Sequence, residues 1–100
     1  MTTHAVRLCV VPGHPALPGH FPGNPLVPGV VVLERVAAAL KAWRGSAVGK
    51  LDAKFVQPLR AGEEAMIALK DDGARVRFEV TRADGRVLAR GTLLAADRQT

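Results

Sequence analysis

The segment from Gly29 to about Trp43 constrains the fold most, because it reads as a helix with almost no polar face. Pro28 suits a first-turn position, and Gly45 follows basic residues that favour the C-terminal end of a helix. A helix that is apolar nearly all round must be buried nearly all round. Its apolar residues are Val30, Val31, Val32, Leu33, Val36, Ala37, Ala38, Ala39 and Leu40.

The segments on either side of this helix differ in character. Residues 12 to 29 hold six of the seven prolines, too many for a helix or a central strand, and form a long loop. Loops of this length in a compact domain are usually functional or disordered. Residues 5 to 11 indicate a first strand, and alternation of apolar and polar residues indicates strands near 50–55, 64–70, 75–81 and 86–96. The clearest buried faces are Leu51, Ala53 and Phe55, and Val76, Phe78 and Val80.

The order of these elements predicts an α+β fold: a strand, a long loop, a buried helix and four antiparallel strands. A strongly twisted antiparallel sheet can wrap around one central buried helix in this order, which is the hotdog fold. The length of 100 residues fits a single domain over residues 1–100. One sheet covers only part of such a helix, so we expect a second subunit to help bury it.

The net charge of +5 raises the question of nucleic-acid binding. Arg75 and Arg77 alternate with apolar residues, however, and belong to the solvated face of a strand. With no tyrosine and one tryptophan, the chain is short of aromatic platforms on which bases could stack. We therefore predict no nucleic-acid partner, and note that a basic surface suits an acidic protein.

The chain has a single cysteine, Cys9, which excludes an intrachain disulfide and a cysteine-based metal site. The three histidines have no spacing typical of metal ligands, so no metal is predicted. No stretch reaches the ~20 apolar residues of a membrane span, and the N-terminal apolar stretch is too short for a signal peptide. We expect a soluble, cytoplasmic protein without membrane association.

Three residues around the junction of loop and helix are candidates for chemistry. His20 lies in the loop and could transfer protons at neutral pH, or could simply bond to backbone. Glu34 lies among apolar neighbours, where burial would favour a neutral carboxyl, or else Glu34 and Arg35 mark a narrow exposed stripe. Gly29 opens the helix, so its N–H could hold a carbonyl oxygen that gains charge, or the glycine only serves a tight turn.

The stretch HFPGNPLVPGVVVLE, from His20 to Glu34, resembles the central motif of the β-hydroxyacyl-[acyl-carrier-protein] dehydratases of the hotdog fold. That motif reads His-Phe-Pro-Gly-x-Pro-x-x-Pro-Gly-Val, followed by Glu or Asp. The segments LDAKFVQPLRAGEE and FEVTRADGRVLARGTL are similar to later segments of the family, so the resemblance covers about residues 5–96. The short length looks more like the small stand-alone dehydratases of aryl polyene or polyketide clusters.

The resemblance implies conversion of a 3-hydroxyacyl thioester to a trans-2-enoyl thioester and water. The histidine matching His20 removes the C2 proton, and the acid matching Glu34 helps to protonate or orient the departing 3-hydroxyl. The amide matching Gly29 binds the thioester carbonyl. The resemblance also implies substrate contacts by Phe21, Val30 and Phe55, the last near the acyl tunnel.

The resemblance further implies acyl carrier protein as the partner and no cofactor, because phosphopantetheine arrives with the substrate. In the family the catalytic residues face each other across a dimer interface, so His20 of one subunit would work with Glu34 of the other. A homodimer is expected, and a hetero-oligomer with another hotdog protein remains open. Ala38 replaces a glutamine common in the family, and Arg35 stands where a small residue is usual. A noncatalytic partner subunit of an active dehydratase and a hotdog acyl thioesterase remain as alternatives.

Overall fold

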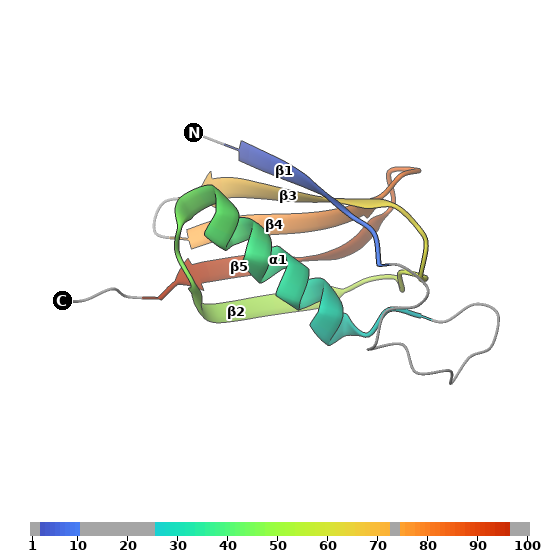
Figure 1. Cartoon of the computed structure of the whole chain (residues 1–100), viewed down its shortest axis with the longest axis horizontal. Coiled ribbons are helices and arrows are strands. Elements are labelled where there is room, and N and C mark those ends of the chain that lie inside the picture. The colour runs from blue at the N-terminus through green and yellow to red at the C-terminus, as the bar shows by residue number, and fades with distance from the viewer. Residues whose placement is uncertain (1–2, 11–25, 73–74, 97–100) are drawn as a thin grey trace.

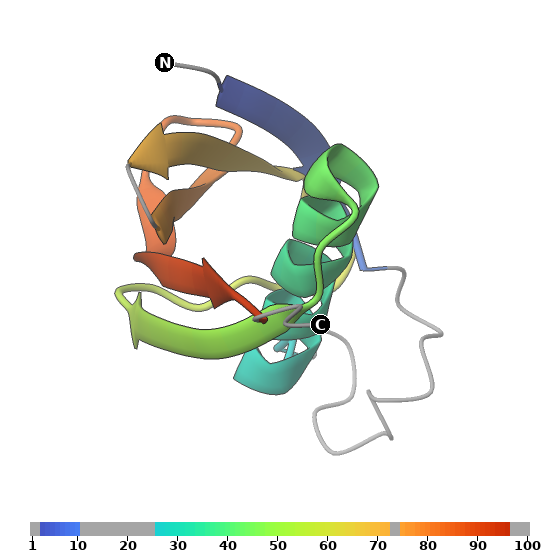
Figure 2. The same cartoon turned by 90° about the vertical axis from the view of Figure 1, so that its left-hand side faces the viewer.

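The computed structural model describes residues 3–10, 26–72 and 75–96. One antiparallel sheet holds all five strands, in the order β1-β3-β4-β5-β2, and one helix lies against it (Figure 1). Figure 2 shows the sheet curving around one side of the helix. The predicted α+β hotdog fold is confirmed. The elements are β1 (Thr3–Leu8), α1 (Gly29–Arg44), β2 (Val48–Phe55), β3 (Ala65–Asp72), β4 (Arg75–Arg82) and β5 (Val87–Ala95).

Helix α1 begins at Gly29, as the sequence indicated, and ends at Arg44, one residue beyond Trp43 and directly before Gly45. Pro28 is the N-cap and has an extended backbone, with φ −60° and ψ 143°. Gly45 ends the helix at φ 73°, a left-handed conformation that glycine adopts without steric cost, and its N–H donates to the Lys41 carbonyl oxygen at 2.7 Å. Lys41 and Arg44 lie in the last turn, where positive charge stabilises the helix dipole.

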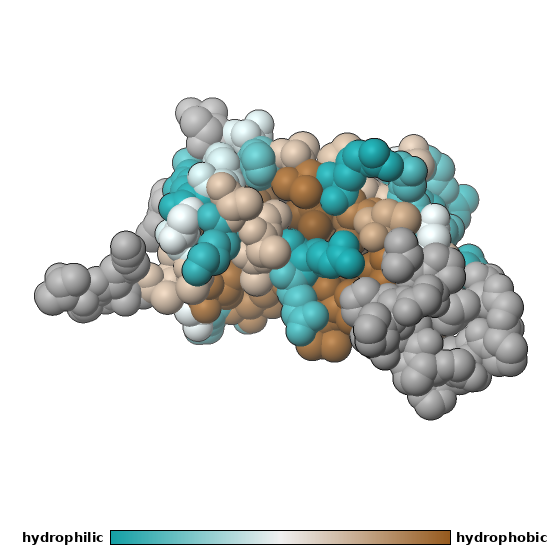
Figure 3. Space-filling model, in the orientation of Figure 1, coloured by the Kyte–Doolittle hydropathy of each residue, from teal (hydrophilic) through white to brown (hydrophobic). Residues whose placement is uncertain are grey.

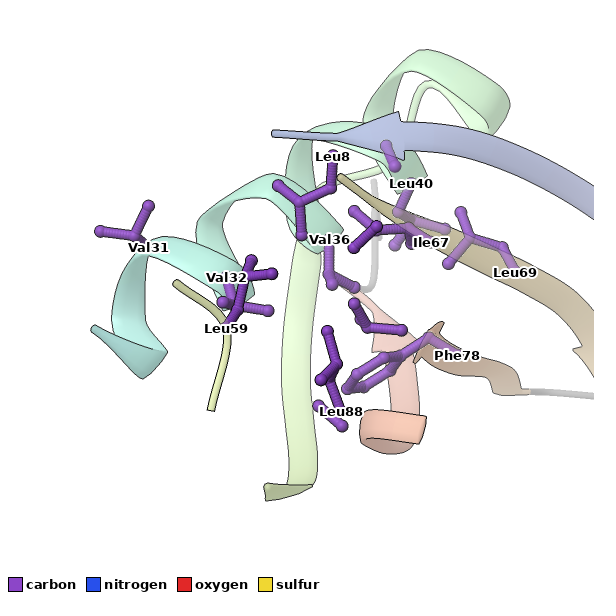
Figure 4. Close-up of a cluster of buried hydrophobic side chains, with 14 of the residues drawn as sticks. Leu8, Val31, Val32, Val36, Leu40, Leu59, Ile67, Leu69, Phe78 and Leu88 are labelled. Carbon is purple, nitrogen blue, oxygen red and sulfur yellow. The ribbon is translucent and has the colours of Figure 1, made fainter. Parts of the chain in front are cut away.

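The core lies between the inner face of α1 and the concave face of the sheet. From the helix, Val32, Val36 and Leu40 are buried, and strands β3, β4 and β5 supply the facing side chains (Figure 4). Alternation along β3 and β4 places every second residue in this core, as predicted, and leaves Arg75 and Arg77 exposed on the other face. The facing side chains include Ile67, Leu69, Phe78, Val80, Leu88 and Leu93.

The C-terminal end of α1 is fastened to the sheet by a stack of side chains. The Trp43 ring lies parallel to the His4 ring of β1, with centroids 5.6 Å apart. On the same tryptophan lies the Arg44 guanidinium, 4.2 Å from the ring centroid, and Arg44 also pairs with Asp71 of β3. These contacts hold the last turn of the helix against β1 and β3.

One chain alone covers α1 on one side only, so burial of the helix nearly all round would need the expected second subunit. Val30 is 62% exposed, and Glu34 and Ala38 are exposed at the same four-residue spacing. A helix has 3.6 residues per turn, so a sheet on one side covers one stripe and leaves the opposite stripe bare. Glu34 therefore lies in an exposed stripe, the alternative that the sequence left open. Figure 3 shows hydrophobic residues open to view on this face, between hydrophilic side chains.

Strand β2 also buries less than its alternation predicts. Leu51 is half-buried, whereas Ala53 is exposed and Phe55 is 48% exposed. The reason is position, because β2 is an edge strand that pairs with β5 alone in the described sheet. Alternation identifies the apolar face of a strand, but it does not show whether another element covers that face. Within the described residues, no helix is long and apolar enough to cross a membrane.

Candidate functional site

A cleft of about 360 Å³ opens where the first turn of α1 meets the end of β2. Its floor comes from β4 and β5, and its walls come from the start of the helix and the segment that follows β2. Apart from Gln57, every side chain in its lining is apolar or absent, so the cleft suits a hydrocarbon group. The lining residues are Val27, Gly29, Val32, Phe55, Val56, Gln57, Pro58, Leu59, Val80, Leu88 and Ala89.

The first turn of α1 brings backbone donors to this cleft. The N–H groups of Val31 and Val32 both lie within hydrogen-bond distance of the Pro28 carbonyl oxygen, at 3.0 and 3.4 Å. The N–H groups of Gly29 and Val30 have no partner within the helix, and proline offers no side-chain cap. The first turn also has no acidic residue to compensate the positive end of the helix dipole. This turn is therefore suited to bind an oxygen that carries partial negative charge.

Gly29 and Phe55, which both line the cleft, lie in direct contact. A Cβ atom at position 29 would lie 2.9 Å from Cζ of the Phe55 ring, closer than van der Waals contact permits. Glycine thus allows the ring to reach the helix backbone. The lack of a side chain also lets a ligand approach the Gly29 amide closely.

The segment after β2 is fixed from several sides. The N–H groups of Val56 and Gln57 both donate to the Leu88 carbonyl oxygen, at 2.8 and 3.2 Å. The Pro58 carbonyl accepts from Arg82 at 2.9 Å. The Leu59 carbonyl accepts from the Val27 N–H at 2.7 Å, which ties this segment to the residues before the helix. The wall of the cleft is therefore held in place before any ligand binds.

Glu34 does not face the cleft of its own chain. Val32 lines the cleft, and two residues along a helix correspond to a rotation of about 200°, so Glu34 points to the opposite side. Val30 is likewise exposed and does not belong to the lining. Among the predicted site residues that the structure describes, Gly29 and Phe55 lie together, and Glu34 lies apart from them. His20 and Phe21 lie outside the described residues.

Several lining residues were not singled out from the sequence. Val80, Leu88 and Ala89 belong to strands far along the chain, and only the sheet order brings them to the start of α1. Gln57 could have been noticed, because it follows Phe55 by two residues, the spacing of side chains on one face of a strand. Among the described His, Cys, Asp and Glu residues, no three gather as a metal site would require.

Solved structures with the same architecture support the fold assignment. A chain of the dehydratase heterocomplex ApeI:P from Xenorhabdus doucetiae superimposes with a TM-score of 0.80 at 21% identity, over 95% of this chain and 88% of that one. An uncharacterized protein from Erwinia carotovora has a TM-score of 0.80 at 24% identity, over 96% and 84% of the two chains. A 1,4-dihydroxy-2-naphthoyl-CoA thioesterase from Synechocystis has a TM-score of 0.69 at 16% identity, over 92% and 79%. At such identities these likenesses show the hotdog fold alone.

Sequence relatives identify the family. The chain is 31% identical to a 3-hydroxyacyl-[acyl-carrier-protein] dehydratase FabZ from Pectobacterium atrosepticum, over 85% of this chain and 67% of that protein. It is 32% identical to the FabZ of Klebsiella pneumoniae, over 82% of this chain and 65% of that protein. The chain thus spans about two thirds of these relatives. The ApeI-like family, described as ApeI dehydratase, matches residues 1–92. The chain therefore belongs to the ApeI-like dehydratase family of hotdog proteins.

Proposed function

We propose that this protein dehydrates 3-hydroxyacyl groups carried by acyl carrier protein, giving trans-2-enoyl thioesters and water. The observation that carries the proposal is the first turn of α1, where Gly29, whose N–H has no partner within the helix, lines an apolar cleft. A thioester carbonyl at Gly29 would place its acyl chain along the apolar lining. Membership of the dehydratase family supports this choice among the reactions of thioesters.

Each step of the reaction then has a group to perform it. The C2 proton next to a thioester is weakly acidic, so a base alone removes it slowly. Donors at Gly29 would stabilise the oxygen of the enolate-like transition state, an effect worth about 10²–10³ in rate. His20 takes the C2 proton, and Glu34 donates a proton to the 3-hydroxyl, which leaves C3 as water. Acid-base groups in position typically add about 10²–10⁴.

The site requires a second subunit, because Glu34 faces away from the cleft of its own chain. We propose that His20 and the cleft of one subunit work with Glu34 of the other. The exposed stripe of α1 and the half-covered β2 edge support such an assembly, since a partner there would bury apolar surface. The partner would then enclose Glu34 and hold it beside the cleft of the other subunit. A homodimer is the simplest arrangement.

The carrier protein supplies both the substrate and the cofactor-like arm. The net charge of +5 suits an acidic carrier protein, because opposite charges raise the rate of encounter. Phosphopantetheine would arrive attached to the carrier, so no resident metal or organic cofactor is part of the proposal.

Incubation with a 3-hydroxyacyl carrier-protein thioester tests the proposal directly. The expected result is loss of 18 mass units from the acyl group, as water leaves, with no release of free thiol. Release of thiol instead would identify a thioesterase. A folded, dimeric protein that leaves the substrate unchanged would contradict the proposal for the homomer.

A noncatalytic partner subunit is the second candidate. A structural neighbour comes from a dehydratase heterocomplex, ApeI:P, which favours the idea that this chain also pairs with a different hotdog protein. Ala38 and Arg35 in place of the usual residues favour it as well. Addition of the second hotdog chain would then be needed for turnover.

Substitution of Gly29 tests the role of the first turn of α1. We expect Gly29→Ala to lower kcat/KM about tenfold, because its Cβ displaces the Phe55 ring from the cleft wall. The melting temperature should hardly change, since the Phe55 ring is half exposed and can move aside. Steady-state kinetics and thermal unfolding of Gly29→Ala, with and without Phe55→Leu, check this. If Phe55→Leu does not recover part of the loss, the steric explanation is wrong.

A further inference from the structure

We propose that the side-chain amide of Gln57 binds an amide of the pantetheine arm and so positions the thioester in the cleft. The inference rests on the proposed function, because it assumes that the ligand is a pantetheine thioester. Gln57 carries the one polar side chain among the eleven residues that line the cleft. In an apolar cleft, the few polar side chains fix the orientation of a ligand.

The local backbone directs Gln57 to the cleft. Phe55 pairs with Ala89 in the regular β2–β5 ladder, but the next two residues, Val56 and Gln57, both bond to the Leu88 carbonyl oxygen. The chain thus leaves the regular ladder after Phe55 but stays bonded to β5, which keeps Gln57 beside the cleft. Gln57 is half-buried and lines the same cleft as Phe55.

The position of Gln57 favours the arm over the acyl chain. Its neighbours Val56 and Pro58 are exposed, so this part of the wall lies at the mouth of the cleft. The deeper lining consists of apolar side chains and suits a hydrocarbon chain; it includes Val32, Val80 and Leu88. At the mouth, a ligand whose thioester carbonyl lies at Gly29 presents the arm rather than the acyl group.

The chemistry of the two groups is complementary. A glutamine amide offers one acceptor oxygen and two N–H donors, and a secondary amide of pantetheine offers one donor and one acceptor. The two can therefore form a pair of hydrogen bonds. The anchored wall contributes as well. Val27 and Arg82 donate hydrogen bonds to this segment, and the Leu88 carbonyl accepts from it, so the backbone on both sides of Gln57 is fixed before binding.

Two substrates separate arm recognition from acyl recognition. A 3-hydroxyacyl pantetheine thioester carries the arm amides, and the corresponding S-propyl thioester carries none. We expect Gln57→Met to raise KM for the pantetheine thioester about three- to tenfold, with kcat within about twofold, as for loss of one or two hydrogen bonds. KM for the S-propyl thioester should stay unchanged. An equal rise for both substrates, or no rise for either, would overturn the inference.

Two further variants and a binding titration make the result decisive. Thr92→Val is the matched control, because Thr92 is half-buried on the opposite face of the sheet, outside the cleft, and its loss should change neither KM. If Gln57→Met does not fold, Gln57→Glu keeps the shape, loses both donors and should raise the same KM.

Binding of a saturated acyl pantetheine is titrated in parallel. If Gln57→Met binds the acyl pantetheine more weakly but the wild type does not turn over, the inference is upheld and the proposed reaction is refuted. If the wild type turns over but Gln57→Met changes neither KM nor binding, the proposed reaction is upheld and the inference is refuted.

Discussion

Dehydration should fall about 10²–10⁴-fold in His20→Ala and in Glu34→Gln, the range typical of losing a placed acid or base. Glu34→Gln removes the proton donor and keeps the shape of the side chain. Because Glu34 is exposed on the single chain, its replacement should not lower the stability of the subunit. Initial rates with a 3-hydroxyacyl carrier-protein thioester, measured beside circular dichroism spectra, check both expectations. Thr92→Val, on the outer face of the sheet and outside the cleft, is a control that should retain activity.

The two inactive variants together test whether the site is shared. In a mixed dimer of His20→Ala and Glu34→Gln, one site loses both groups and the other keeps both. Random reassociation of equal amounts makes half of the dimers mixed, so about a quarter of the wild-type rate should return. The mixture needs a subunit-exchange step, verified by native mass spectrometry. Mixed dimers without recovered activity would show that His20 and Glu34 do not act across an interface.

Gly91→Ala should destabilise the fold by about 3 kcal/mol, the upper range for forcing atoms into a packed region. A Cβ at Gly91 would lie 1.9 Å from the Asp52 carbonyl oxygen and 2.9 Å from Cα of Ala53, both backbone atoms of β2. Backbone cannot move aside as a side chain can, so the β2–β5 ladder must open. Since β2 carries Phe55, activity should fall with stability. Urea unfolding of the wild type and the variant measures the difference.

Gly45→Ala is the matched glycine control. Nothing lies within 4 Å of a Cβ at Gly45, so its cost comes only from the left-handed backbone at φ 73°. That cost is about 1–2 kcal/mol. A smaller loss in Gly91→Ala than in Gly45→Ala would mean that the close approach of β2 and β5 at Gly91 does not exist in solution.

The sequence predicted the elements well because their determinants are local. Proline and glycine at positions 28 and 45 bound α1, and alternation around Val76 and Phe78 marks β4. Strand ends were less accurate: residues 5 to 11 indicated a first strand that the structure places at Thr3–Leu8. The end of a strand depends on its partner, here β3, which the local pattern does not contain.

The site was only partly predictable for the same reason. The family resemblance named both Gly29 and Phe55 as site residues, but neither the resemblance nor periodicity predicted that the two are in contact. Periodicity placed Glu34 in an apolar helix but could not tell which layer would cover that side of the helix. The floor of the cleft, formed by Val80, Leu88 and Ala89, depends on the strand order of the sheet, a long-range property.

The outer edge of β2 carries a charge pattern that restricts how a second β2 could align with it. Lys50, Asp52 and Lys54 alternate along this edge strand, and like charges directly opposite each other destabilise a strand pair. If two copies met antiparallel about a twofold axis at Asp52, that residue would face itself and Lys50 would face Lys54. An axis at Leu51 or Ala53 instead sets Asp52 against a lysine. The edge thus discriminates between neighbouring registers and disfavours a shift by one residue.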